Sequence, residues 1–306
     1  MARLARVKAE NSGAFYHLCG RVAGVIGEYP LGDKRCRRKI VDFIRLFARI
    51  YCCRVLGFCV MGNHYHLVVR MDDPRKMTRK ELRERALLLY DDTLLDAWLA
   101  RSWERFEARI FDVSELMRSL QSKIARWFNL THNRRGRFWA ERFKSVLIED
   151  EKAMYDCLLY VELNPVRANI VSRPEEYDGS SLYYREMRDD KWMAPLRDIT
   201  FRPRRSEAMT DYKSSIYYRG SVATKESHAV ISNRLLAREE ARGFATEGLY
   251  RKRIRHFTDG VVIGSEEYVK ERLERLRAAG QYLRRRNPVS RLGGMHMILR
   301  PQRGVA

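Results

Sequence analysis

A predicted β-hairpin around Gly62-Asn63 constrains the fold of this chain more than any other stretch. The runs Arg54–Val60 and His64–Arg70 have the composition of strands, and Gly-Asn between them suits a tight turn. Because residues i and i+2 of a strand point to the same face, the imidazoles of His64 and His66 face one way and the intervening tyrosine faces the other. Two histidines placed like this can share a metal ion, although the same pattern also occurs in packed or solvated pairs.

The first 185 residues predict an α+β fold, in which helices flank an antiparallel sheet. The stretch Asp33–Tyr51 has one apolar stripe, as expected of an amphipathic helix that packs on a sheet. The other predicted elements are strands over 14–22 and 143–149, a helical region over 78–111, and helices that begin near Asp112 and Asp150.

The sequence divides into three predicted parts, because the pattern loosens after about residue 185. Residues 1–185 would form the main domain, which contains the candidate site residues described below. Residues 186–234 mix charge, prolines and tyrosine pairs, as in a linker or peripheral segment. Residues 235–306 predict a basic, helical C-terminal extension that contacts DNA. It contains an amphipathic helix from Ser265 to Leu276 and ends in Arg284-Arg-Arg286 and Arg291.

The chain is strongly basic, with 60 Lys and Arg against 39 Asp and Glu and a net charge of +21. Such a balance favours a polyanionic partner, usually nucleic acid, over a basic surface kept for solubility. The segment His132–Trp139 is the first candidate for DNA contact, with Phe138 or Trp139 either stacking on an unpaired base or anchoring the core. The predicted phosphate contacts are Arg134, Arg135, Arg137, Arg142 and Lys144.

Several classes of protein are disfavoured by the sequence. No stretch approaches the ~20 apolar residues that span a bilayer, and the N-terminus has no secretory signal pattern. The six cysteines form no Cys-x-x-Cys pair, which favours reduced thiols and a cytoplasmic location. No Walker-type phosphate loop is present, which disfavours chemistry that needs a nucleotide cofactor.

Tyr160 and Asn164 are four residues apart in a predicted helix, so both should project from one face. If that face meets the histidine strand, His64, His66 and Asn164 can hold a divalent cation beside the Tyr160 hydroxyl. Pro165 disfavours helical geometry at Asn164, so this alignment is approximate. Imidazole suits Mn²⁺ better than Mg²⁺, but an amide oxygen with waters and phosphate also accepts Mg²⁺.

These groups together suit phosphoryl chemistry. The cation would polarise a phosphate oxygen while the Tyr160 oxygen attacks phosphorus and expels a sugar 3′-hydroxyl. The alternative for Tyr160 is an ordinary half-buried tyrosine. Tyr155 is the competing nucleophile, but five residues away on a helix it faces elsewhere.

Three motifs in order resemble the REP-associated tyrosine transposases, which are single-tyrosine relatives of the His-hydrophobic-His endonucleases. The likeness covers most of residues 12–185, with a second patch near 244–300 that includes Phe257–Ser265. Tyr16-His17-Leu18 also looks like the first strand of the longer members. The motifs that carry the resemblance are Phe58–His66, Glu141–Asp150 and Tyr160–Asn169.

This resemblance implies a ferredoxin-like or RRM-like sheet and metal-dependent cleavage of single-stranded DNA through a 5′-phosphotyrosine. By matching positions, Tyr160 becomes the nucleophile, and His64, His66 and Asn164 become the metal ligands. Members of the family recognise short palindromes that fold as hairpins. Arg167 would touch the scissile strand or only the C-terminal end of a helix.

Three other functions remain open from the sequence. A replication initiator or relaxase would use the same histidines and tyrosine, but commonly carries a helicase domain or a second catalytic tyrosine. A domesticated hairpin-binding protein would keep the fold and charge and cut poorly. An RNA-binding regulator would fit the charge but not the His-Tyr pattern. The target hairpin, and whether the protein is a monomer or a homodimer, are left open.

Overall fold

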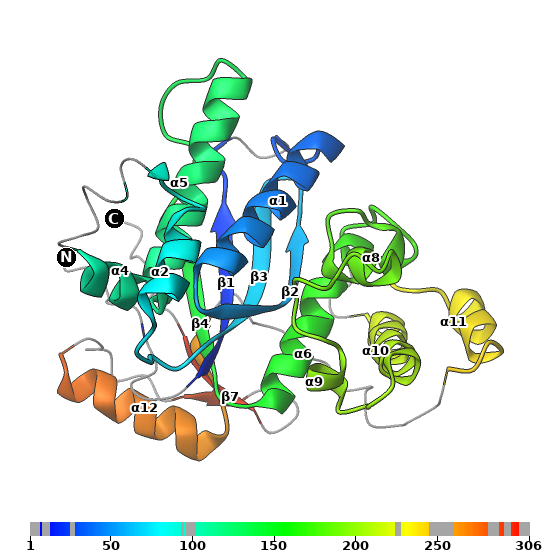
Figure 1. Ribbon diagram of the computed structural model, residues 1–306. Helices are drawn as coiled ribbons and strands as arrows, with labels where there is room; N and C mark the ends of the chain where they lie inside the picture. Colours follow the sequence, from blue (N-terminus) through cyan, green and yellow to red (C-terminus); the bar gives the residue numbers. More distant parts are fainter. Residues whose placement is uncertain are drawn as a thin grey trace, which may run out of the picture.

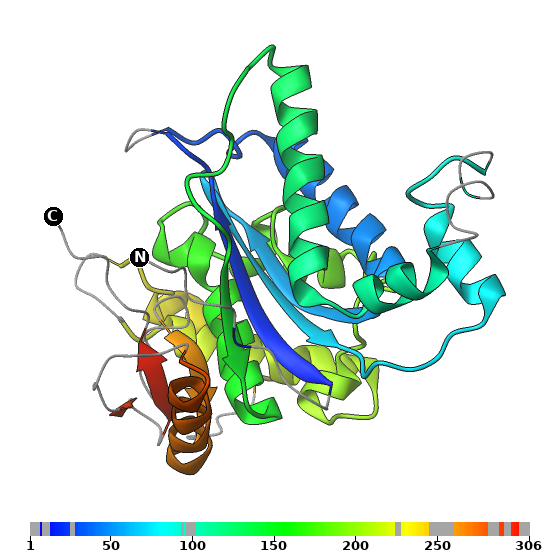
Figure 2. The ribbon, with the colours of Figure 1, turned by 90° about the vertical axis from the view of Figure 1, so that its left-hand side faces the viewer.

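A mixed sheet of seven strands forms the centre of the protein, with helices on both of its faces (Figures 1 and 2). The order of the strands is β2-β3-β1-β4-β5-β7-β6. The predicted α+β fold is therefore confirmed. The computed structural model describes residues 7, 13–24, 28–92, 95, 102–223, 228–244, 260–280, 288–290 and 295–299.

The first four strands form an antiparallel unit, because β1 pairs with both β3 and β4, and β2 pairs with β3. Helices α1 and α5 connect these strands and pack against the same core on one face of the sheet. The chain order β1-α1-β2-β3-α5-β4 is that of a ferredoxin-like unit. The bounds are β1 (Ala14–Arg21), α1 (Lys34–Ile50), β2 (Cys53–Val60), β3 (His64–Met71), α5 (Val113–Thr131) and β4 (Lys144–Ile148).

Aspartate side chains begin three of the helices, which explains why the helix starts are readable from the sequence. The Asp33 side chain accepts a hydrogen bond from the backbone N–H of Cys36, and Asp112 caps α5 in the same manner. Asp150 caps α6 (Glu151–Glu162), the helix that carries Tyr160. Within its described residues, the helical region predicted over 78–111 contains α2 (Arg79–Ala86) and α4 (Trp103–Ile110).

The opposite face of the sheet is covered by α6 and by the helices that follow it (Figure 2). Helix α6 ends before Pro165, and the chain continues directly into α7. The further elements are α7 (Asn164–Arg167), a 3₁₀ turn η1 (Pro174–Glu176), α8 (Ser181–Glu186), α9 (Arg197–Thr200), α10 (Arg205–Gly220) and α11 (Asn233–Glu240).

Residues 186–234, predicted as a linker or peripheral segment, contribute to this second core. Helix α10 buries Tyr212, Ile216 and Tyr217 in the core that also contains residues of α6. The tyrosine hydroxyls have partners, since Tyr212 donates to Glu162 and Tyr217 to Glu175. Tyrosines that are satisfied in this way can be buried, although their polar groups made the segment look exposed in the sequence.

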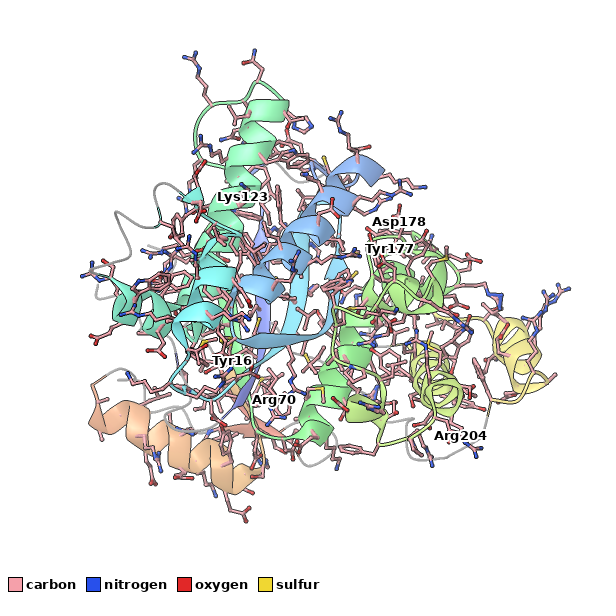
Figure 3. All side chains as sticks on the ribbon, viewed as in Figure 1. Tyr16, Arg70, Lys123, Tyr177, Asp178 and Arg204 are labelled. Atoms are coloured by element: carbon pink, nitrogen blue, oxygen red, sulfur yellow. The ribbon has the colours of Figure 1, made fainter. Side chains whose placement is uncertain are left out.

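The segment before α8 binds the end of the hairpin strand β2. The hydroxyl of Tyr177 donates to the carbonyl oxygen of Val60 over 2.7 Å, and Asp178 forms an ion pair with Arg37 of α1. Figure 3 shows Tyr177 and Asp178 near α8, and Tyr16 and Arg70 at the other end of the sheet. The segment before α8 therefore links the β2 edge of the sheet, beside the Gly62-Asn63 turn, to helix α1.

The C-terminal part adds strands to the sheet as well as a helix. Strand β5 (Gly260–Gly264) pairs in parallel with β4, and β7 (His296–Leu299) and β6 (Val289–Ser290) continue the sheet. Ser265 caps α12 (Glu266–Ala278), close to the predicted helix. The basic stretch Arg284–Arg286 and Arg291 lie outside the described residues.

In the described ranges, no helix is both long and apolar enough to cross a membrane. All six cysteines are free thiols, and four of them are buried.

Candidate functional site

Tyr160 lies against a group of histidines where α6 crosses β1 and β3. Its ring centroid is 5.7 Å from that of His66 and 6.2 Å from that of His17, in edge-on contacts. His66 and His17 are 2% and 1% exposed, whereas Tyr160 is only partly buried. The fold thus brings the predicted nucleophile to the predicted histidine strand and leaves it accessible.

His64 lies next to His66 at the start of β3, with their ring centroids 5.0 Å apart and their planes perpendicular. Its Nδ1 is 2.8 Å from Oδ1 of Asn63 in the hairpin turn. Because an amide oxygen only accepts, Nδ1 of His64 carries the proton and Nε2 retains its lone pair. This is the usual arrangement of a histidine that binds metal through Nε2.

Both histidines of the pair are held in the neutral form. Burial, with a smaller contribution from the charge of Arg21, lowers the pKa of His64 to about 4. Burial, then the neighbouring His17 and His64, places the pKa of His66 well below its ordinary value. A neutral imidazole is the form that binds a metal ion, so no proton has to be displaced at neutral pH.

Asn164 follows Tyr160 by one helical turn, at the start of α7. Its Nδ2 donates to the backbone carbonyl of Tyr160 over 2.9 Å and to that of Val161 over 3.3 Å. These two bonds fix the amide plane, so Oδ1 points away from the helix backbone and can serve as a hard oxygen ligand. Asn164 as the third ligand stays a prediction.

The donor set suits a divalent cation. Nε2 of His66 is buried and has no hydrogen-bond partner among the described residues, as expected of a ligand atom. No group of three or more His, Cys, Asp or Glu side chains suited to a metal ion is found in the part of the chain that the structure describes. A site here would therefore combine two imidazoles with the amide oxygen of Asn164, which fits Mn²⁺ or Mg²⁺ better than a thiolate-binding metal.

Arg167 lies on Tyr160, with its guanidinium carbon 5.7 Å from the centre of the phenol ring. Burial lowers the pKa of Arg167 to about 10, and the adjacent Tyr160 opposes that shift. The side chain is still cationic at neutral pH, so it places a positive charge against the phenol ring of Tyr160. Tyr155 faces elsewhere, as predicted, because its hydroxyl donates to Ser215 on α10.

The predicted DNA-binding segment joins the site through backbone hydrogen bonds. Val22 donates to the carbonyl of Asn63 over 2.9 Å, and Ala23 donates to the carbonyl of Phe138 over 2.8 Å. Ala140 in turn donates to the carbonyl of Arg21 over 2.9 Å. The end of β1 therefore lies between the hairpin turn that precedes His64 and the basic segment 132–139.

The side chains of this basic segment divide into exposed cations and buried aromatics. Phe138 is 2% exposed and packs on Phe128 of α5, which favours the core-anchor alternative for Phe138 over base stacking. Trp139 is partly buried, and its indole N–H donates to the carbonyl of Gln121. Arg135, Arg137 and Arg142 are exposed, Arg134 lies over the ring of Phe138, and Lys144 is 3.5 Å from Glu141.

His17 also belongs to this site, although the sequence assigned it no role beyond the likeness of Tyr16-His17-Leu18 to a first strand. It lies on β1, on the face that α6 covers, and its Nε2 is 2.9 Å from Nδ1 of His66. Tyr16 and Leu18, its two neighbours, point to the other core. A histidine in an apolar strand was the available signal, but only the pairing of β1 with β3 shows that it meets His66.

Comparisons with known proteins give little further information. No protein-family model and no curated protein matches the chain. Among solved structures, a similar chain is a REP-associated tyrosine transposase bound to a REP hairpin. The two chains are 12% identical with a TM-score of 0.38, over 61% of this chain and 87% of the other.

Proposed function

We propose that this protein is a transposase: a metal-dependent endonuclease and strand transferase that acts on single-stranded DNA folded into hairpins, with Tyr160 as its nucleophile. The observation that carries this proposal is the position of Tyr160, whose ring contacts His66 on one side and lies under the Arg167 guanidinium. A tyrosine with a purely structural role would not require a neighbouring buried histidine whose Nε2 has no hydrogen-bond partner among the described residues. It would also not require a guanidinium over its ring.

The proposed reaction is a transesterification. The Tyr160 oxygen forms a bond to phosphorus, the bond from phosphorus to the 3′ oxygen breaks, and the 3′-hydroxyl leaves with a proton. A divalent cation, Mg²⁺ or Mn²⁺, held by His64, His66 and Asn164 would polarise the phosphate oxygen. Arg167 stabilises the negative charge on the phenol oxygen as it attacks.

The product is a 5′-phosphotyrosine at Tyr160, which retains the energy of the broken phosphodiester. The 3′-hydroxyl of a second DNA end can therefore reverse the step and join the strands without a nucleotide cofactor. In this proposal Arg135, Arg137 and Arg142 neutralise phosphates of the DNA leading into the site. Their exposure, and the hydrogen bonds that join their segment to the end of β1 beside His64, support this role.

The experiment that tests this function compares substrates. Labelled DNA of the same sequence is offered as a single-stranded hairpin, as a linear duplex and as the corresponding RNA hairpin, with Mn²⁺, Mg²⁺ or a chelator. The hairpins should come from inverted repeats beside the gene. We expect metal-dependent cleavage of the single-stranded DNA hairpin alone. Tight hairpin binding with no cleavage would instead indicate a domesticated binding protein.

A further inference from the structure

Two buried histidines on neighbouring strands share one hydrogen bond. Nε2 of His17 on β1 is 2.9 Å from Nδ1 of His66 on β3, and their rings stack with centroids 5.1 Å apart. The β1–β3 register pairs Cys19 with His66, so His17 is the diagonal neighbour of His66 on the same face. Both rings are almost fully buried, and water does not compete for the bond.

The proton on this bond decides what the second nitrogen of His66 can do. A neutral imidazole has one N–H and one lone pair. If His17 donates, the proton of His66 is on Nε2, where it is buried without an acceptor among the described residues. If His66 donates from Nδ1, its Nε2 carries a lone pair instead. A buried N–H without an acceptor is costly in every state of the protein, whereas a lone pair is satisfied when a cation binds.

We propose that His17 is a positioning residue: it accepts the Nδ1–H of His66 and thereby holds Nε2 of His66 unprotonated for a divalent cation. His17 is not itself placed as a ligand through Nε2, because that atom faces Nδ1 of His66. Asn63 holds Nδ1 of His64 in the equivalent way. Each histidine of the pair thus has Nδ1 bound to the protein and Nε2 available. The binding of a cation rests on the proposed function, but the position of the proton does not.

The position of the proton can be measured in the metal-free, full-length protein. Nitrogen-15 NMR of the histidine rings distinguishes the two tautomers, and the His66 signals are assigned by their loss in His66→Ala. We expect His66 to carry its proton on Nδ1. A proton on Nε2 of His66 would overturn the proposal.

Variants of His17 test its effect on the metal site. A glutamine at this position offers an oxygen acceptor for the Nδ1–H of His66, whereas a leucine offers none. His17→Leu should therefore bind Mn²⁺ about 10- to 100-fold more weakly than the wild type, and His17→Gln should have an intermediate affinity. Folded His17→Leu protein with wild-type Mn²⁺ affinity would contradict the proposal. If His17→Leu does not fold, the tautomer of the wild type decides alone. If the wild type shows the expected tautomer but binds no Mn²⁺, the His17–His66 pairing is supported. The same result counts against the proposed function.

Discussion

Arg167 and Tyr160 form a contact in which a cation lies over a phenol ring, with 5.7 Å between the guanidinium carbon and the ring centroid. The two residues are seven positions apart, on α6 and α7, and Pro165 lies between them. Seven residues are about two helical turns, so Arg167 returns to the face of Tyr160, and the step from α6 into α7 at Pro165 keeps this relation. The two consecutive helices α6 and α7 thus place a positive charge beside the proposed nucleophile.

Replacing Arg167 should slow cleavage more than it weakens DNA binding. Without the cation, the phenol ionises less readily, so Arg167→Gln should lower the single-turnover rate by about 10²-fold at neutral pH. Arg167→Lys should recover part of the rate. Rates come from quenched reactions at saturating protein, and affinities from hairpin titrations without metal. Loss of affinity with an unchanged rate would mean that Arg167 only contacts DNA.

Changing Asn164 should alter the preference for metals. Asn164→Ala removes the amide oxygen and should weaken Mn²⁺ binding, whereas Asn164→Asp retains an oxygen and adds charge, which should shift the preference toward Mg²⁺. Calorimetric titration of each variant with both ions measures this. Thermal melts serve as the control, since the amide nitrogen also bonds the end of α6. Unchanged affinities for both ions would remove Asn164 from the ligand set.

The exposed arginines of the basic segment should govern the salt dependence of binding. Arg135→Ala with Arg142→Ala should weaken hairpin binding and reduce the slope of log affinity against log salt by about 1 to 2. The control is Arg202→Ala with Arg204→Ala, which removes the same charge near α10; Figure 3 shows Arg204 in that region. Equal effects of the two pairs would indicate general charge rather than a defined DNA path.

The Glu162 carboxyl should make the folded protein less stable as the pH rises above 4.5, the ordinary pKa of this group in the unfolded chain. This carboxyl on α6 is fully buried and accepts hydrogen bonds from Ser181, Leu182 and Tyr212, and burial raises its pKa from 4.5 to about 7. The folded state then binds more protons than the unfolded state between pH 4.5 and 7, so up to about 3 kcal/mol of stability is lost across that window.

Urea unfolding at several pH values measures this loss. Glu162→Gln should flatten the dependence between pH 4.5 and 7, while the exposed Glu207→Gln should leave it as in the wild type. A Glu162→Gln variant whose stability still falls by the same amount would assign the effect to another group.

The parts of the fold and site that were predictable from the sequence depend on local patterns. Strand alternation placed His64 and His66 on one face, and aspartate caps marked the starts of α1, α5 and α6. Helical spacing placed Tyr160 and Asn164 on one face. Strand alternation, helix caps and helical spacing are all readable because each depends on residues only a few positions apart. From the sequence, the contact between α6 and β3 could only be assumed, whereas the structure shows it between Tyr160 and His66.

The features that were not predictable depend on contacts between distant segments. His17 meets His66 only through the β1–β3 register, and β5 joins β4 across more than a hundred residues. The burial of Phe138 and Tyr212 was not readable from the sequence for a related reason. Aromatic residues among charged neighbours look exposed in the sequence, but each is buried by helices from elsewhere in the chain.

The most direct measurement of the central claim is the covalent adduct. Wild type, Tyr160→Phe and the matched control Tyr155→Phe are incubated with end-labelled hairpin DNA and Mn²⁺, then separated on a denaturing protein gel. We predict label on the wild type and on Tyr155→Phe only when metal is present, and none on Tyr160→Phe despite unchanged hairpin affinity. Label that persists on Tyr160→Phe would contradict the assignment of Tyr160 as the nucleophile.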